Sequence, residues 1–302
     1  MIASNINKLV LAILGPTASG KTSVAIEIAK KNNGVIINCD SRQIYKEMLI
    51  GTASPSDEEK EEVPHKLFNF LSPQLQFNAS DYAKAASEAI KETWAESKLP
   101  ILVGGTGFYY SAISEGLGEA GSDSDLANQL QRELDQKGLS YMVEKLGKLD
   151  SEATNTIDVN NSRRVLRAIE IVISTGKPFS ENKPVSLLPE AVFHPVVVSR
   201  TRELLHERIA LRVKQMFEEG LENEVKHIIE KYGINAAAIS SIGYREWLEF
   251  FEGKINLDEV KELILIHTRQ YAKRQETWFR KKPGVPIIYL DDINEKDVIS
   301  QI

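Results

Sequence analysis

An eight-residue segment near the N-terminus has the pattern of a phosphate-binding loop. It consists of Gly15, Pro16, Thr17, Ala18, Ser19, Gly20, Lys21 and Thr22, which fits G-x-x-x-x-G-K-[ST]. An apolar segment at 9–14 precedes it and a helical pattern follows it, which is the context that this motif requires. In such loops backbone N–H groups surround phosphate oxygens, the lysine adds a positive charge, and the hydroxyl binds Mg²⁺. The sequence therefore predicts a di- or triphosphate site with Lys21 on the phosphates and Thr22 as the metal ligand.

A carboxylate follows the second predicted strand. The apolar segment 35–38 ends just before Asp40. In an open parallel sheet, ligands bind at the carboxyl ends of the strands, so we expect Asp40 to lie near the phosphate loop. Phosphate repels a carboxylate, which leaves two interpretations. Asp40 is a general base or metal-ordering group, or it caps the turn at Asp40–Ser41.

The sequence disfavours a hydrolytic P-loop motor. Such an ATPase places a metal-ordering aspartate at the end of a later strand. Here the apolar segment 100–103 is followed by Gly104, Gly105, Thr106 and Gly107. A hydrophobic run that ends in aspartate, 287–291, occurs only near the end of the sequence. The loop is therefore expected to hold a phosphorylated substrate or leaving group.

The elements that position these residues alternate between apolar runs and helical patterns, which predicts a parallel sheet with helices on both faces. Strands are expected at 9–14, 35–38, 66–71, 100–103, 194–199 and 286–290. Helices are expected from 21 to about 33, and at 80–97, 203–218, 221–232 and 256–280, with Ser80 as the N-cap of the second.

The alternation of strands and helices stops in the middle of the chain. Between the strands expected at 100–103 and 194–199, only helical patterns occur, at 126–136, 140–146 and 163–175. The simplest interpretation is a run of surface helices, and the one we favour is an all-helical insertion at 118–189. The fold class is then α/β: a P-loop NTPase-like, nucleoside-kinase-like parallel sheet with flanking helices, built from 1–117 and 190–302.

Composition limits the classes of protein that fit. The chain has 302 residues, 37 basic and 43 acidic side chains, and a net charge of −6. Its single cysteine excludes an intramolecular disulfide and a cysteine-rich zinc module. The early apolar run at 9–14 is too short for a membrane span, so we expect a cytoplasmic protein. The segment 269–282 nevertheless carries six basic residues against one acidic residue, which is compatible with a polyanionic partner.

Seven further motifs occur together with the phosphate loop. They are Asp40 to Tyr45, Ile50 to Ala53, Gly104 to Gly107, Arg163 to Glu170, Arg208-Ile209, Ile242 to Arg245 and Thr268 to Arg280. In this order and over nearly the whole chain, the set resembles the bacterial tRNA dimethylallyltransferases, also called tRNA isopentenyltransferases, of the IPP transferase family.

The resemblance implies a prenyl transfer. The dimethylallyl group of dimethylallyl diphosphate would move to N6 of adenosine 37, beside the anticodon of tRNAs that read codons beginning with U, and diphosphate would leave. The products would be diphosphate and N6-dimethylallyladenosine. The implied cofactor is Mg²⁺, the implied partner is the anticodon loop of tRNA, and we expect a monomer.

The resemblance also assigns roles to residues of this chain. Asp40 would accept the N6 proton, while Lys21, Thr106 and Arg208 would contact the diphosphate or its bridging oxygen. Asn128 stands where some members have an arginine that touches tRNA. The expected tRNA contacts are Asp40, Ser41, Arg42, Gln43, Thr106, Asn128, Arg163, Arg164, Arg167, Gly243, Tyr244, Arg245, Lys273, Arg274, Gln275, Trp278 and Arg280. Without the resemblance, 163–167 is equally well a solvated basic helix, and the aromatic residues Tyr271, Trp278 and Phe279 are equally well core residues.

Three other functions fit part of these observations. One is prenylation of free AMP, ADP or ATP, against which the arginine-rich insertion and the basic segment 269–282 argue. Another is a P-loop small-molecule kinase with Arg208 as a lid arginine, which the missing later-strand aspartate disfavours. The third is an RNA-binding module whose loop binds a regulatory nucleotide. In such a module Asp40 and Thr106 would have no function, which argues against it.

Overall fold

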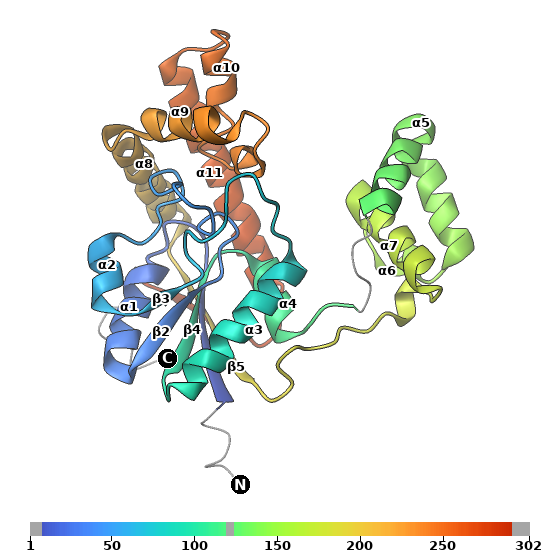
Figure 1. Cartoon of the computed structure of the whole chain (residues 1–302), viewed down its shortest axis with the longest axis horizontal. Helices are drawn as coiled ribbons and strands as arrows, with labels where there is room; N and C mark the ends of the chain where they lie inside the picture. The colour runs from blue at the N-terminus through green and yellow to red at the C-terminus, as the bar shows by residue number, and fades with distance from the viewer. Residues whose placement is uncertain (1–7, 119–123, 292–302) are drawn as a thin grey trace. The chain divides into compact units, whose positions relative to one another are not determined.

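The computed structural model describes residues 8–118 and 124–291, which fall into two compact units (Figure 1). One unit comprises 1–114 and 187–302, and the other comprises 115–186. The first contains a six-stranded sheet in the order β3-β2-β4-β1-β5-β6, with every neighbouring pair parallel. Its strands are β1 (Leu9–Leu14), β2 (Gly34–Asn38), β3 (His65–Lys66), β4 (Leu99–Gly104), β5 (Val192–Ser199) and β6 (Ile287–Tyr289). The predicted parallel α/β fold is confirmed.

Helices cover both faces of this sheet. In β1, Leu11 and Ile13 pack against Val24 and Ile28 of α1 (Lys21–Asn32), while alternate residues point to the other face. Figure 1 shows α1 and α3 on opposite sides of the sheet. Because both faces are covered, β1 is apolar throughout and has no polar alternation. The helices beside the sheet are α1, α2 (Asp57–Glu62), α3 (Ala79–Ala95) and α4 (Gly107–Ser114).

A second group of helices lies beyond the carboxyl ends of the strands (Figure 1). They are α8 (Arg202–Glu218), α9 (Leu221–Tyr232), α10 (Trp247–Phe251) and α11 (Leu257–Arg280). Their core includes Tyr244 and Trp247, both fully buried, and it incorporates Ile44 and Met48 from the segment after β2. This packing brings α8 and α11 to the edge of the sheet that carries the phosphate loop. Although α11 spans 24 residues, no helix among those described is long and apolar enough to cross a membrane.

The unit 115–186 is helical and has its own core. It contains α5 (Ser124–Leu149), α6 (Ala153–Thr156) and α7 (Ser162–Thr175), followed by a 3₁₀ turn at Phe179–Glu181. The core joins α5 to α7 through Leu130, Met142, Val165 and Ile169. At Gly138 the backbone has φ +79°, which interrupts α5 between the two helical segments predicted at 126–136 and 140–146. The strong amphipathic pattern of α7 is what lets so small a unit bury an apolar face.

Two local predictions were wrong. The third strand, expected at 66–71, is only His65–Lys66, because Leu67 and Asn69 have positive φ values of 63° and 47° that no strand accommodates. The predicted N-cap Ser80 lies inside α3. The cap is Asn78, whose side chain accepts hydrogen bonds from the backbone of residues 80 and 81. The start of α3 contains three possible cap residues, Asn78, Ser80 and Asp81, and periodicity does not choose among them.

Candidate active site

The phosphate loop lies between β1 and α1, as the apolar segment before it and the helical pattern after it predict. Gly15 has φ +152°, and a Cβ there would come within 2.1 Å of the carbonyl oxygen of Val198 on β5. Gly20, the residue before α1, is left-handed with φ +96°. Glycine therefore meets a steric requirement at the first of these positions and a conformational one at the second. The loop leads directly into the N-terminus of α1, where the helix dipole attracts phosphate.

Lys21 is the cation of this loop. Its Nζ donates a hydrogen bond to the carbonyl oxygen of Pro16 at 3.2 Å. The pKa of Lys21 is lowered to about 8, chiefly by burial; the Asp40 carboxylate acts to raise this pKa and the Arg212 guanidinium to lower it. An anion in the loop would favour the protonated form. The protonation state of Lys21 therefore depends on whether the loop holds an anion.

Asp40 lies just past β2 and occupies a structured turn. Its backbone N–H donates to the Asn38 side chain at 2.8 Å, and its Oδ1 accepts a hydrogen bond from the N–H of Arg42 at 2.8 Å. The turn-capping interpretation is thus confirmed. It does not exclude the other interpretation, because Asp40 also lines a cavity that it shares with Thr17 of the phosphate loop.

This cavity has a volume of about 250 Å³ and is lined by both polar and apolar side chains. The polar residues include Thr17, Asp40 and Thr52. The apolar residues come from α8, α11 and the segment between α9 and α10. The apolar residues are Val213, Met216, Ile242 and Ile264, and the cations at the cavity are Arg42, Arg212, Arg245 and Arg274. Such a space accommodates an apolar group attached to an anion.

The loop after β4 lies against the turn that carries Asp40. Thr106 Oγ1 accepts a hydrogen bond from the N–H of Ser41 at 2.9 Å, and the N–H of Thr106 donates to the carbonyl oxygen of Cys39 at 3.2 Å. The approach is close: a Cβ on Gly104 would come within 2.0 Å of that same carbonyl oxygen. Thr106 also shares a hydrogen bond with Tyr271 of α11, whose pKa is raised, chiefly by burial. The predicted residues Asp40, Ser41 and Thr106 are therefore brought together.

Two arginines of α8 reach the phosphate loop. Arg208 Nε donates to the carbonyl oxygen of Ala18 at 2.8 Å. Arg212 donates from Nη1 to Thr17 Oγ1 and from Nη2 to the carbonyl oxygen of Thr52, both at 2.9 Å. Arg208 was expected here from the family resemblance, whereas Arg212 was not predicted. The spacing of four residues, which puts both on one helix face, was the available signal.

Gln275 of α11 ties two loops together. Its Oε1 accepts a hydrogen bond from the N–H of Thr17 and its Nε2 donates to the carbonyl oxygen of Gly105, both at 2.9 Å. The side chain is 5% exposed. The resemblance assigned Gln275 to the tRNA surface, whereas the structure places its amide inside the site. A glutamine in a basic segment gave no sequence signal for this position.

The segment 242–245 divides between core and surface. Tyr244 is fully buried, and its ring packs so closely on Gly51 that a Cβ there would lie 2.5 Å away. The N–H of Gly243 donates to Glu246 Oε2 at 2.8 Å, and Arg245 is exposed beside the same carboxylate. Of the three predicted tRNA contacts here, Gly243 and Arg245 line the cavity and Tyr244 supports it from behind.

The basic residues of α11 line a groove with the start of α8. Arg269, Lys273 and Arg280 share it with Arg200 and Arg202, and its volume is about 580 Å³. These three cations of α11, at offsets of four and seven residues, therefore face the same groove. The other basic residue predicted here, Arg274, lines the Asp40 cavity instead.

The aromatic residues of α11 do not form a common exposed surface. Phe279 is 1% exposed and belongs to the core, so the core interpretation was right for it. Trp278 packs against Gly107, where a Cβ would lie 2.3 Å from the indole ring. Lys282 Nζ lies 4.9 Å from the centre of the same ring.

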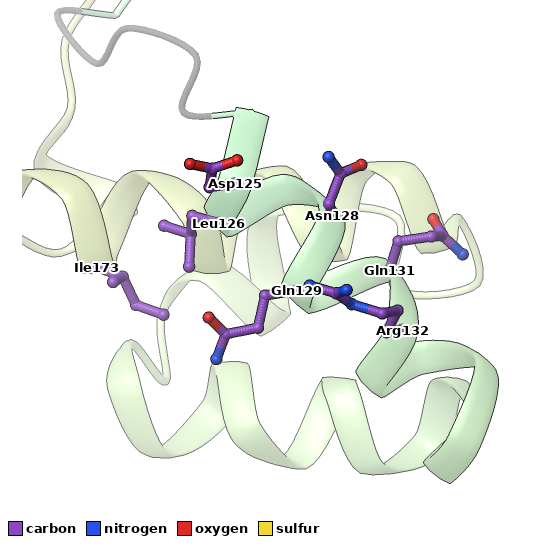
Figure 2. A pocket seen from close by; sticks show the side chains of 7 residues that line it. All are labelled: Asp125, Leu126, Asn128, Gln129, Gln131, Arg132 and Ile173. Atoms are coloured by element: carbon purple, nitrogen blue, oxygen red, sulfur yellow. The ribbon is translucent and has the colours of Figure 1, made fainter.

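The predicted contacts in the helical unit belong to two of its helices. Arg163 and Arg164 are exposed on the first turn of α7, and Arg167 pairs with the buried Glu170 at 2.8 Å. Asn128 lines an open pocket of about 820 Å³ on α5 and α7. Figure 2 shows Asn128, Gln131 and Arg132 projecting from the first half of α5, with Ile173 reaching the pocket from α7.

The donors available to a metal ion are few. Among residues 8–118 and 124–291, no group of three His, Cys, Asp or Glu side chains could hold a metal ion. Thr22 is partly exposed on the first turn of α1, beside the loop. Mg²⁺ in phosphate sites takes one or two protein oxygens and completes its shell with phosphate oxygens and water. A hydroxyl at the end of a phosphate loop fits that donor set.

Asp291 follows β6 and has a structural role. It pairs with Arg200 at 3.3 Å and accepts a hydrogen bond from the N–H of Thr201. Arg200 in turn donates from Nε to the carbonyl oxygen of Ser19 at 3.1 Å. The aspartate that ends the last apolar run therefore holds the start of α8 to the phosphate loop.

Comparisons with known proteins agree on one family. Residues 43–282 match the model of the family described as IPP transferase. The tRNA dimethylallyltransferase of Acetivibrio thermocellus is 41% identical over 295 residues, which cover 96% of this chain and 94% of that protein. That of Petrotoga mobilis is 40% identical over 296 residues, with 97% of each chain covered.

Solved structures agree with the sequence comparisons. The full-length tRNA isopentenylpyrophosphate transferase of Bacillus halodurans superposes with a TM-score of 0.70 at 35% identity, covering 97% of this chain and 94% of that one. A eukaryotic dimethylallyltransferase acting on tRNA superposes with a TM-score of 0.80 at 27% identity, covering 97% of this chain and 77% of that one.

Proposed function

Because the chain belongs to the IPP transferase family, we propose that it transfers the dimethylallyl group of dimethylallyl diphosphate to N6 of adenosine 37 in tRNAs that read codons beginning with U. The observation that carries this proposal is the shared cavity of Thr17 and Asp40. It joins Thr17 of the phosphate loop, a carboxylate and apolar side chains in one space. A P-loop kinase has no use for the apolar side chains, and a binding module has no use for the carboxylate.

The diphosphate of the donor binds in the loop 15–22. Backbone N–H groups, the N-terminus of α1 and Lys21 surround its oxygens. Arg208 and Arg212 are fixed to the loop from α8, so their positive charges stay in place as the carbon–oxygen bond breaks and charge develops on the leaving group. The prenyl group lies against apolar side chains of the cavity such as Val213 and Ile264.

Asp40 receives the proton from the acceptor. The N6 nitrogen forms a bond to C1 of the dimethylallyl group, the C1–O bond breaks, and the diphosphate leaves with the bonding electron pair. The nitrogen then carries an extra proton, which passes to the carboxylate of Asp40. Since Oδ1 of Asp40 is fixed by the N–H of Arg42, the orientation of the carboxylate is set before the substrate arrives. Thr106, held by Ser41, faces the bridging oxygen of the donor.

Mg²⁺ would be held by the Thr22 hydroxyl together with diphosphate oxygens, and it would supply positive charge against the leaving group. The protein residues that neutralise the same group are Lys21, Arg208 and Arg212.

The anticodon loop contacts the surfaces that carry positive charge. In the sheet-containing unit these are the cavity edge at Arg42, Arg245 and Arg274 and the groove that includes Lys273. In the helical unit they are Arg163 and Arg164, with the polar Asn128 on α5. The adenine must leave the anticodon stack to reach Asp40, at a cost of a few kcal/mol.

The test is a radiolabel transfer assay with bulk tRNA, labelled dimethylallyl diphosphate and Mg²⁺, with AMP and ATP as parallel acceptors. Label in tRNA that disappears with Asp40→Asn supports donor, acceptor and base together. Label in the mononucleotides alone would assign the chain to free-nucleotide prenylation. Absence of label from every acceptor would contradict the proposal and favour a phosphoryl transfer from a nucleoside triphosphate.

A further inference from the structure

Glu224, on the first turn of α9, has a carboxylate that accepts four hydrogen bonds. Its Oε2 accepts hydrogen bonds from the N–H groups of Leu49 and Ile50, both at 2.8 Å. Its Oε1 accepts from the N–H of Gly51 at 3.0 Å and from the hydroxyl of Tyr244 at 2.6 Å. Four donors converge on one carboxylate, which uses its full acceptor capacity.

The backbone that Glu224 binds belongs to the active-site cavity. Three consecutive N–H groups point at the carboxylate, so the course of residues 49–51 is fixed by one side chain from a distant helix. Gly51 and the residue after it, Thr52, line the cavity together with Asp40. The carbonyl oxygen of Thr52 accepts the hydrogen bond from Arg212 Nη2 at 2.9 Å. Glu224 is thus connected to Arg212 through a short stretch of backbone.

The same backbone stretch also holds Gln43. Its Nε2 donates to the carbonyl oxygen of Ala53 at 2.7 Å and approaches that of Thr52 at 3.3 Å. Gln43 lies in the segment that begins with Asp40. Displacement of residues 49–53 would therefore disturb both sides of the cavity: the guanidinium of Arg212 and the segment that follows Asp40.

Behind the loop, Tyr244 completes the arrangement. Its hydroxyl donates to Glu224 Oε1, and its ring occupies the space that a side chain at position 51 would need. Gly51 is therefore the residue that lets the backbone approach the ring while its N–H reaches the carboxylate. The loop is held on one side by hydrogen bonds and on the other by van der Waals contact.

We propose that Glu224 is a positioning residue for prenyl transfer, which sets the place of the Arg212 guanidinium at the diphosphate through the backbone of residues 49–52. The inference rests on the proposed function for its kinetic part. The part that concerns anion binding does not, because it requires only that Arg212 contributes to the phosphate site.

The test variant is Glu224→Gln, which keeps the size of the side chain but turns one acceptor into a donor facing donors. The matched control is Glu222→Gln on the same helical turn, whose carboxylate pairs with Lys226 on the surface. We expect Glu224→Gln to weaken binding of inorganic diphosphate about tenfold and to reduce kcat/KM about 100-fold, as misplacement of a reacting-site group does. We expect no change for the control.

A double-mutant cycle with Arg212→Lys separates positioning from a general loss of stability. If Glu224 acts through Arg212, the two effects on diphosphate binding are less than additive, because the second change removes what the first has already displaced. Additive effects, or diphosphate binding that is unchanged in Glu224→Gln, would overturn the inference. If the wild-type protein binds diphosphate but prenylates no acceptor, the proposed function is refuted. The double-mutant cycle on diphosphate binding would still test whether Glu224 positions Arg212.

Discussion

The arginines of α8 and those of α7 are similar in sequence context and different in structural role. Both helices carry arginines among apolar residues. On α8, Arg208 and Arg212 donate to a carbonyl oxygen and a hydroxyl of the phosphate loop. On α7, Arg163 and Arg164 are exposed on the first turn. The first pair is hydrogen-bonded to the phosphate loop, and the second presents its charge to solvent.

The difference shows how a cation becomes part of a preorganised site. A guanidinium whose donors are already fixed to the backbone needs no reorganisation when charge develops on a leaving group, and its contribution is correspondingly large. A guanidinium in solvent contributes through long-range attraction and counterion release, which salt weakens. Substitutions should therefore change catalytic constants at α8 and the salt dependence of RNA binding at α7.

The largest effect is expected at Asp40, the carboxylate that lines the cavity shared with Thr17 and Arg212. Asp40→Asn keeps an oxygen that can accept the N–H of Arg42 but removes the proton acceptor, so kcat should fall by about 10²–10⁴-fold. Affinity for tRNA, measured by filter binding, should remain. The control is Asp57→Asn on the exposed start of α2. Turnover at the wild-type rate in Asp40→Asn would rule out the assignment of the base.

Next in size is the loss of a fixed guanidinium on α8. Arg212→Lys keeps the charge but cannot bridge Thr17 and the carbonyl oxygen of Thr52 at once, so kcat/KM should fall by about 10²-fold. The same replacement at the exposed Arg163 should leave kcat/KM within about twofold, since a solvated lysine and arginine attract phosphate similarly. Equal losses at both positions, in steady-state kinetics with saturating tRNA, would contradict the distinction between the two helices.

The pH dependence of kcat/KM tests the role of the Lys21 charge in the phosphate loop. Since burial lowers the pKa of Lys21 to about 8, the free enzyme should lose this charge as the pH rises through that value, and kcat/KM for the donor should fall. Bound diphosphate favours the protonated lysine, so the corresponding fall in kcat should occur at higher pH. In Lys21→Arg, the kcat/KM that remains should no longer fall as the pH rises through about 8. A kcat/KM profile that stays flat well above the pKa of Lys21 would contradict the assignment.

The smallest effect is expected on α7. Replacing Arg163 and Arg164 together by glutamine should weaken tRNA binding several-fold, leave kcat unchanged, and reduce the salt slope of log K by about 1 for each arginine–phosphate ion pair that the change removes. Lys148→Gln, at an exposed position of α5, is the control. An unchanged salt slope in the double variant would mean that this face of the helical unit does not bind tRNA.

Much of the site could be predicted because its chemistry is local in sequence. The phosphate loop needs only a strand, two glycines and a helix start, all within residues 9–22. Asp40 follows directly from the end of β2, and Arg269, Lys273 and Arg280 share a groove because the spacing of an α-helix requires it. Short-range geometry of this kind is fixed by backbone dihedrals and helical periodicity, which a sequence carries in full.

Other roles depend on which distant segments meet. Arg212 and Gln275 reach Thr17 from positions 195 and 258 residues away, and Glu224 reaches residues 49–51 from α9. Their residue types are ordinary for amphipathic helices, so no local pattern distinguishes them from solvated side chains. What selects them is the burial of Tyr244 and Trp247, which draws α8, α9 and α11 onto the carboxyl ends of the strands. The sequence by itself determined the parallel sheet, the phosphate loop and the nearby carboxylate. Only the tertiary structure decided which polar side chains hold that site in place, because the meeting of distant helices depends on how their apolar faces pack.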